Sequence, residues 1–170
     1  MKNVLLNLAN TNKGHNMLCD IKDAYVEVLK YHIRRNEGAN FAFKTNSCAE
    51  ADVILIKAIA KFIAKAEGIS ANLRYVDCGI NDVQFGVTIA DNILGRYNHN
   101  ALSYSSIKIE SEFKRDYTLF NTLLHEIVHW TQDKMMDYEF DSCDIDYDKR
   151  KHEIQAFFIS DCIIDMMQGK

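Results

Sequence analysis

The chain has 170 residues, of which 48% are hydrophobic and 26% charged, and its net charge is −4. This length suits a single domain, residues 1–170, that can bury a core without disulfides or a metal to hold it together. A slightly acidic chain lacks the basic surface expected when nucleic acid is the main partner, so a nucleic-acid partner is unsupported.

The cysteines and the apolar runs indicate a cytoplasmic protein. The five cysteines are widely spaced, odd in number and without a CxxC pair, which argues against a disulfide framework and a thiolate zinc site. The apolar run within residues 1–14 is short and interrupted by Asn7 and Asn10, so we expect no secretory signal. No run reaches the roughly 20 apolar residues that cross a membrane, and no membrane partner is expected.

Two helices are expected in the first half of the chain. From about His15 to Asn36, apolar residues recur three and four positions apart. A second helix should run from about Ala49 to Glu67. It should end at Gly68, because glycine is favoured just past the end of a helix.

The middle third consists of short segments rich in β-branched and aromatic residues. Three of them, residues 74–80, 83–90 and 102–110, are predicted to be strands. The imperfect alternation in the last segment is typical of an edge strand.

The helical period then returns. Asp116 or Thr118 can cap a helix that runs to about Lys134, an acidic connection follows at 137–148, and a last helix should run from about Tyr147 to Met167. Together these elements predict an α+β fold in which a small, mostly antiparallel sheet packs against helices.

The helix that ends near Lys134 contains HEIVH at residues 125–129. His125 and His129 are one turn apart on one face, so both can reach one metal ion at about 2.0–2.1 Å. Glu126 lies about 100° around the helix, too far to be a comfortable ligand but able to reach a water beside the ion. This arrangement is the one that general-base hydrolysis requires.

A catalytic zinc usually has three protein ligands and one open position. A third histidine at the position of the longer HExxHxxGxxH motif is excluded, because residue 135 is Met. Glu153, early in the last helix, is the expected third ligand. The alternatives are His152 and the acids of the connection, Asp141, Asp144, Asp146 and Asp148.

HExxH followed by a helical glutamate resembles the gluzincin branch of zinc metallopeptidases. More closely, TLLHEIVHWTQ and the later HEIQAFF resemble the metallopeptidase domain of ArdC-type antirestriction proteins and related phage polyvalent proteins, over roughly residues 95–165. ImmA/IrrE-like peptidases share this arrangement. The resemblance implies a zincin-like fold with HExxH on the active-site helix and Zn²⁺ held by His125, His129 and Glu153. It also implies Glu126 as catalytic base and, for a phage protein, a location in the host cytoplasm.

The chain departs from the ArdC pattern at two positions. His152 replaces the first glutamate of the family's EExxAE, and Phe157 replaces its last acid. The single-stranded-DNA-binding domain expected before such a peptidase is too large for the residues present, so DNA binding is not implied. LGRYNHNALSYSSIKI before the motif is similar to SprT-like peptidases, but these use a later histidine with a glycine that does not accompany His152.

The sequence therefore predicts a zinc metallopeptidase acting on a protein or peptide substrate. Tyr138, Tyr147 and His152 are candidate donors to the oxyanion, and the sequence does not choose among them. Candidate cleft residues, each also a candidate core residue, are Trp130, Tyr104 and Phe140. The alternative is a binding or antirestriction protein on the same scaffold that occupies a host partner without cleaving it, with the acidic strip at 137–148 imitating the charge of DNA.

Overall fold

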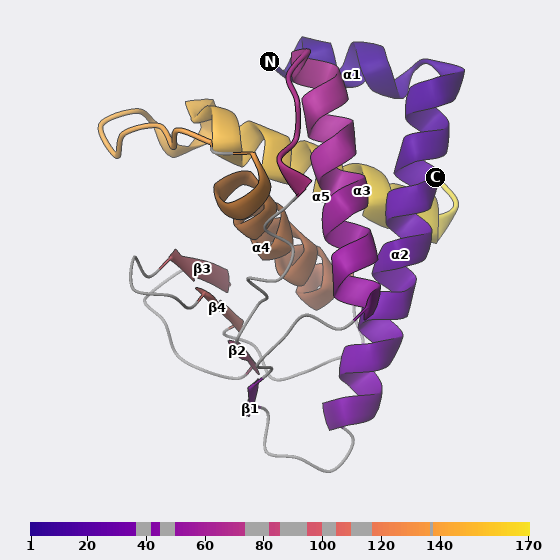
Figure 1. Ribbon diagram of the computed structural model, residues 1–170, viewed down its shortest axis with the longest axis vertical. Coiled ribbons are helices and arrows are strands. Elements are labelled where there is room, and N and C mark those ends of the chain that lie inside the picture. Colours follow the sequence, from indigo (N-terminus) through magenta and orange to yellow (C-terminus); the bar gives the residue numbers. More distant parts are fainter. Residues whose placement is uncertain are drawn as a thin grey trace.

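The computed structural model describes residues 1–36, 42–44, 50–73, 82–85, 95–99, 105–109, 117–136 and 138–170. Side chains are described in 1–31, 50–73, 121–136 and 138–170. The elements in chain order (Figure 1) are α1 (Lys2–Ala9), α2 (Asn12–Asn36), β1 (Ala42–Lys44), α3 (Glu50–Glu67), β2 (Asp82–Phe85), β3 (Gly95–His99), β4 (Ser105–Ile109), α4 (Tyr117–Met135), the 3₁₀ turn η2 (Tyr147–Lys149) and α5 (Lys151–Gln168). The strand predicted at 74–80 lies outside the described residues.

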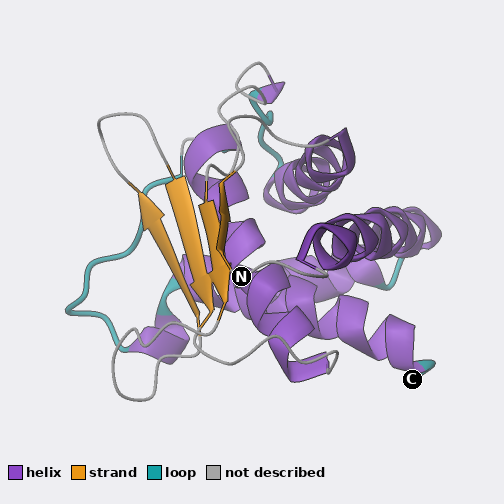
Figure 2. Cartoon of the chain, turned by 90° about the horizontal axis from the view of Figure 1, so that it is seen from below, coloured by secondary structure: helices purple, strands orange, loops and turns teal. Residues whose placement is uncertain are grey.

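The prediction of an α+β fold, with a sheet packed against helices, is wrong. About 80% of the residues with described side chains are helical, and none of them lies in a strand. The strands are only three to five residues long and lie to one side of the helices (Figure 2). The apolar residues that fill the described core belong to helical stripes, so the fold is mostly helical.

The four short strands pair in the order β1-β2-β4-β3. β2 runs parallel to β4, whereas β1–β2 and β3–β4 are antiparallel, with Ile107 of β4 opposite both Val83 and Tyr97. The sheet is therefore mixed. β4 lies inside it, so the prediction of an edge strand at 102–110 is wrong. The terminal strand β3 has its backbone next to α4.

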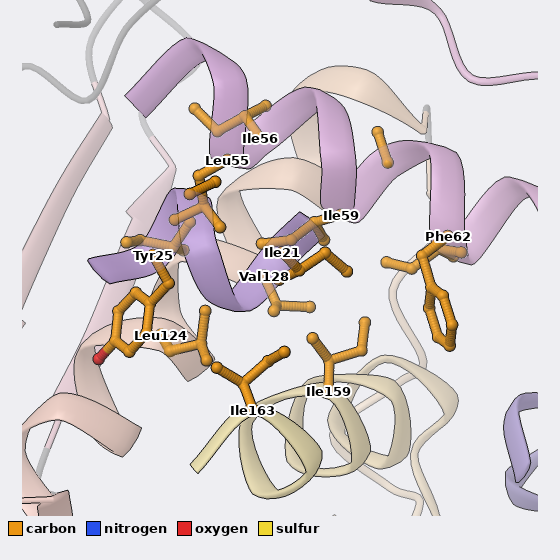
Figure 3. Packing of buried hydrophobic residues seen from close by; sticks show 14 of the residues in the cluster. Ile21, Tyr25, Leu55, Ile56, Ile59, Phe62, Leu124, Val128, Ile159 and Ile163 are labelled. Atoms are coloured by element: carbon orange, nitrogen blue, oxygen red, sulfur yellow. The ribbon is translucent and has the colours of Figure 1, made fainter. Parts of the chain in front are cut away.

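The core between the helices holds α4 and α5 in place. Figure 3 shows Ile159 and Ile163 of α5 directed toward Val128 of α4 and Ile21 of α2. Burying each such side chain contributes about 1.5–3 kcal/mol to stability. The labelled residues of this cluster are all fully buried, and they are Ile21, Tyr25, Leu55, Ile56, Ile59, Phe62, Leu124, Val128, Ile159 and Ile163. Contributions from four helices fix the positions of the two that carry the HExxH motif and Glu153.

The first helix, α1, was not predicted, because Asn7 and Asn10 interrupt its apolar pattern. The Thr11 hydroxyl closes the turn into α2 by accepting a hydrogen bond from the Gly14 N–H at 3.0 Å and donating one to the Leu8 carbonyl at 2.7 Å. A Cβ on Gly14 would lie 1.9 Å from the Leu8 oxygen. Glycine is therefore required where the two helices meet.

The other helices agree closely with the predicted limits. α3 ends at Gly68 as predicted: this glycine has a φ of +68°, and the next N–H, of Ile69, donates to the Ala64 carbonyl at 3.0 Å. α5 begins at Lys151 rather than at Tyr147, because residues 147–149 form a separate 3₁₀ turn. Within the described ranges, no helix is both long and apolar enough to cross a membrane.

Candidate metal centre

Two helices supply the candidate site. α4 carries His125, Glu126 and His129 on consecutive turns, and the first turn of α5 carries His152 and Glu153. All five residues are buried, with 6–7% of their surface exposed. α4 and α5 pack against each other, while the connection between them extends to the upper left in Figure 1.

Three side-chain atoms converge between these helices. His125 Nε2 lies 3.0 Å from His129 Nε2 and 3.1 Å from Glu153 Oε2, and His129 Nε2 lies 3.2 Å from the same Glu153 oxygen. The structure thus brings together the three side chains that the sequence predicts as ligands. This buried group could bind a metal ion.

The geometry of the group fits a metal ion. Three ligands at about 2.0–2.1 Å from a tetrahedral ion are about 3.3 Å from one another. The three distances here are 3.0, 3.1 and 3.2 Å. Each of these atoms can present a lone pair to the same point, and a cation satisfies all three at once, whereas a single proton is shared unequally. Two nitrogens and one oxygen suit Zn²⁺ and other divalent transition metals.

Burial and charge set the protonation of the group. Burial lowers the pKa of His125. It also opposes charge on His129, but the hydrogen bond to Glu153 and the charges of Glu126 and Glu153 outweigh burial and raise its pKa. Burial favours a protonated Glu153, yet its close contacts with both histidines hold the pKa of Glu153 well below its usual range. At neutral pH His125 is therefore neutral and Glu153 ionised, the forms in which they bind a cation.

Glu126 lies beside the group rather than in it. Its charge contributes to the raised pKa values of His129 and Tyr147, which places its carboxylate near both. The candidate ligand group found among the described residues does not include it. The role of Glu126 as catalytic base stays a prediction.

Tyr147 is the predicted donor that lies in contact with the ligands. Its hydroxyl lies close enough to interact with the Glu153 carboxylate, and burial followed by this interaction raises the pKa of Tyr147, which keeps the hydroxyl protonated. Tyr138 points elsewhere, with its hydroxyl 4.0 Å from the sulfur of Met1 and its pKa raised by burial to about 12. The structure therefore favours Tyr147 over Tyr138 as a donor at this site.

His152, the rival third ligand, lies next to the group but outside it. Its Nδ1 accepts a hydrogen bond from the Asp141 backbone N–H at 3.3 Å, and its Nε2 lies 3.6 Å from Glu153 Oε1. Burial lowers the pKa of His152, and because Nδ1 accepts a hydrogen bond, the neutral ring carries its proton on Nε2. His152 is therefore a neighbour of the ligand group and not a member of it.

The acids of the connection are engaged locally and are not brought to the histidines. Asp141 accepts a hydrogen bond from the Lys151 backbone at the start of α5. Asp144 accepts one from Ser142, and Asp146 pairs with Lys149. The fourth acid, Asp148, is exposed. None of these four belongs to the candidate ligand group.

Exposed aromatic rings surround the ligand group. The Phe157 ring centre lies 4.5 Å from that of His125, the Phe140 ring 6.3 Å from that of His129, and Tyr147 6.0 Å from Phe157. These three rings, which we call the aromatic rim, are 40–50% exposed although large apolar side chains are usually buried. The other two cleft candidates differ: Trp130 is a fully buried core residue, and Tyr104 lies outside the described residues.

Sequence reasoning missed two glutamines at the site. Gln132 Oε1 lies 2.9 Å from Nδ1 of His129, and Gln155 contacts the amide of Gln132. Both glutamines are fully buried. The available signal was a long polar side chain three residues after a candidate ligand, within an otherwise apolar helix.

No family model matches the chain, and no curated protein or solved structure shows a significant match. The functional argument therefore rests on the site itself, because a fold alone does not define an activity. The group of His125, His129 and Glu153 defines a candidate metal-binding protein.

Proposed function

We propose that this chain is a zinc-dependent metallopeptidase, the activity implied by its resemblance to gluzincins and ArdC-type peptidase domains. The observation that supports it is the convergence of His125, His129 and Glu153 with the Glu126 carboxylate alongside. Zn²⁺ is the preferred ion because two imidazoles and one carboxylate, with one further position open, are the donor set of many catalytic zinc sites.

The three ligand residues would hold the ion between α4 and α5. Zinc would polarise the scissile carbonyl and make a water more acidic. Glu126 then takes a proton from the attacking water, whose oxygen bonds to the carbonyl carbon. As the carbon–nitrogen bond breaks, Glu126 passes that proton to the leaving amine. The protonated hydroxyl of Tyr147 donates to the oxygen on which negative charge develops.

Two features near the ligands support a peptide substrate. β3 is a terminal strand whose backbone lies beside α4, and an extended peptide can pair with such a strand through main-chain hydrogen bonds. The aromatic rim places exposed apolar surface next to His125 and His129. Such surface suits the side chains that flank a scissile bond.

The first test is metal content and hydrolysis measured on the same preparations. Elemental analysis should give one zinc per wild-type chain and little in His129→Ala or Glu153→Ala. Glu126→Gln is the matched control, because it should keep the zinc while hydrolysis of a peptide library falls about 10²–10⁴-fold. If the wild type binds no zinc even when it is supplied, or if Glu126→Gln hydrolyses as fast as the wild type, the proposal is wrong.

The second candidate function is a binding or antirestriction protein that occupies a host partner. It is favoured by the acidic connection, where the exposed acids are Glu139, Asp144, Asp146 and Asp148. Glu126→Gln separates the two functions, because a protein that acts by occupancy keeps its effect without this base. Conversion of Asp146 and Asp148 to asparagine should then weaken the effect without altering zinc content.

A further inference from the structure

A chain of side-chain hydrogen bonds leads from the metal centre to the end of α3. His129 Nδ1 lies 2.9 Å from Gln132 Oε1, Gln132 Nε2 donates to Gln155 Oε1 at 3.0 Å, and Gln155 Nε2 donates to Glu67 Oε1 at 3.1 Å. The chain joins three helices, since Glu67 ends α3, His129 and Gln132 lie on α4, and Gln155 lies on α5. We call these four residues the amide relay.

Atoms that can only accept hydrogen bonds fix the direction of the relay. Gln132 Nε2 also donates to the main-chain carbonyl of His152 at 2.9 Å. A carbonyl oxygen cannot donate, so the amide nitrogen of Gln132 must face it and the amide oxygen must face His129. At the far end the Glu67 carboxylate, also an acceptor, requires the nitrogen of Gln155. Each amide therefore has one allowed orientation, and Nδ1 of His129 must be the donor to Gln132.

Burial makes this arrangement hard to reverse. Gln132 and Gln155 are both fully buried, so an amide turned the other way would set nitrogen against nitrogen and oxygen against oxygen with no water to compensate. The other histidine differs, because Nδ1 of His125 is buried with no hydrogen-bond partner among the side chains that the structure describes. The relay thus acts on one histidine of the pair.

We propose that Gln132, Gln155 and Glu67 are positioning residues that hold His129 in the tautomer with its proton on Nδ1 and its Nε2 lone pair directed at the candidate metal position. The bond from Gln132 to the carbonyl of His152 also ties α4 to the residue before Glu153. One amide therefore orients one ligand and anchors the helix turn that supplies another. The inference rests on the proposed function only for its consequence in zinc binding, since the relay belongs to the metal-free chain.

The tautomer can be measured directly in the metal-free, full-length protein. Nitrogen-15 NMR of the histidine rings distinguishes protonated from unprotonated ring nitrogens. Above the raised pKa of His129, where its ring is neutral, we expect a protonated Nδ1 and an unprotonated Nε2. Gln132→Met, which keeps the length of the side chain but makes no hydrogen bond, should shift His129 toward a mixture of tautomers and leave His15 unchanged. A wild-type His129 with its proton on Nε2 would overturn the proposal, whether or not zinc binds.

The half-buried end of the relay, Glu67, offers a matched pair of variants outside the fully buried core. Glu67→Gln keeps an acceptor for Gln155, whereas Glu67→Met removes it. We expect the His129 signals of Glu67→Gln to match the wild type and those of Glu67→Met to show the second tautomer. Identical His129 signals in the two variants would contradict the relay, even if Gln132→Met failed to fold.

Zinc affinity gives the second readout. Competition with a chromophoric chelator should show binding about 10–100-fold weaker in Gln132→Met, the usual cost of losing a residue that orients a ligand. Urea unfolding of the metal-free variants separates this loss from general destabilisation. Unchanged affinity in Gln132→Met would refute the positioning role. A wild type that binds no zinc would refute the proposed function, while the tautomer measurement would still decide the relay.

Discussion

Zinc should stabilise the folded chain strongly, because its ligands come together only when α4 and α5 dock. His125 and Glu153 are 28 residues apart in sequence, so the unfolded chain offers at most the two histidines of HExxH as a local pair. An ion that binds only the folded state stabilises it by about 4.1 kcal/mol at a free concentration 1,000 times its Kd. For a chain of this size each kcal/mol raises Tm by about 2–4 °C, so zinc should raise Tm by about 8–16 °C.

The assay is thermal unfolding followed by circular dichroism, after chelation and again after zinc is restored. Glu126→Gln should show the full shift, because it keeps all three ligands. Glu153→Ala should lose most of the shift, because only the local histidine pair remains. An equal zinc-dependent shift in Glu153→Ala and the wild type would show that the ion binds elsewhere, and the assignment of the centre would be wrong.

Three further predictions concern stability and reactivity. Gly14→Ala should destabilise the protein by about 1–3 kcal/mol in urea unfolding, although alanine favours helices, because its Cβ would overlap the Leu8 carbonyl; an unchanged midpoint would contradict the close contact of α1 and α2. Burial raises the pKa of Cys162 to about 11, so peptide mapping after alkylation at pH 8 should find Cys162 modified more slowly than the exposed Cys143; faster labelling of Cys162 would refute this. The pKa of Glu153 lies below its ordinary value of 4.5, so its stabilising contribution is present above that pH and is lost as pH falls below it. The stability difference between metal-free wild type and Glu153→Gln should therefore shrink on acidification, and a difference that grows would show that the sign is wrong.

The sequence predicted the metal group because its signal is local and chemical. HExxH places two histidines on one helix face through the period of the helix alone, and this needs no tertiary information. The prediction of Glu153 required one further assumption, that the last helix packs against the helix that carries HExxH. Its place was open to His152, and only the packing of α5 shows that the His152 ring lies outside the group.

The fold class was less accessible, for physical reasons. The high strand propensity of the middle third predicted strands of seven to nine residues, whereas the described strands have three to five, and the described core is built from helices. α1 was not predicted because Asn7 and the capping residue Asn10 interrupt its apolar pattern. Its one buried residue, Leu5, is buried only by packing against other helices. The position of Gln132 in an otherwise apolar helix could have marked it as a site residue, but its pairing with Gln155 depends on tertiary packing and leaves no periodic pattern in the sequence.

The division of the ligands between helices has a consequence for the order in which the centre is built. Two of the three atoms belong to α4, so this part of the site exists as soon as one helix has formed, on a timescale near a microsecond. The third arrives only with α5, after a loop of the chain has closed. We therefore expect a newly made chain to bind an ion weakly through the two histidines of α4 at first, and to bind it tightly only after Glu153 joins them. Metal supply would then influence how fast the two helices dock, as well as how stably they remain together.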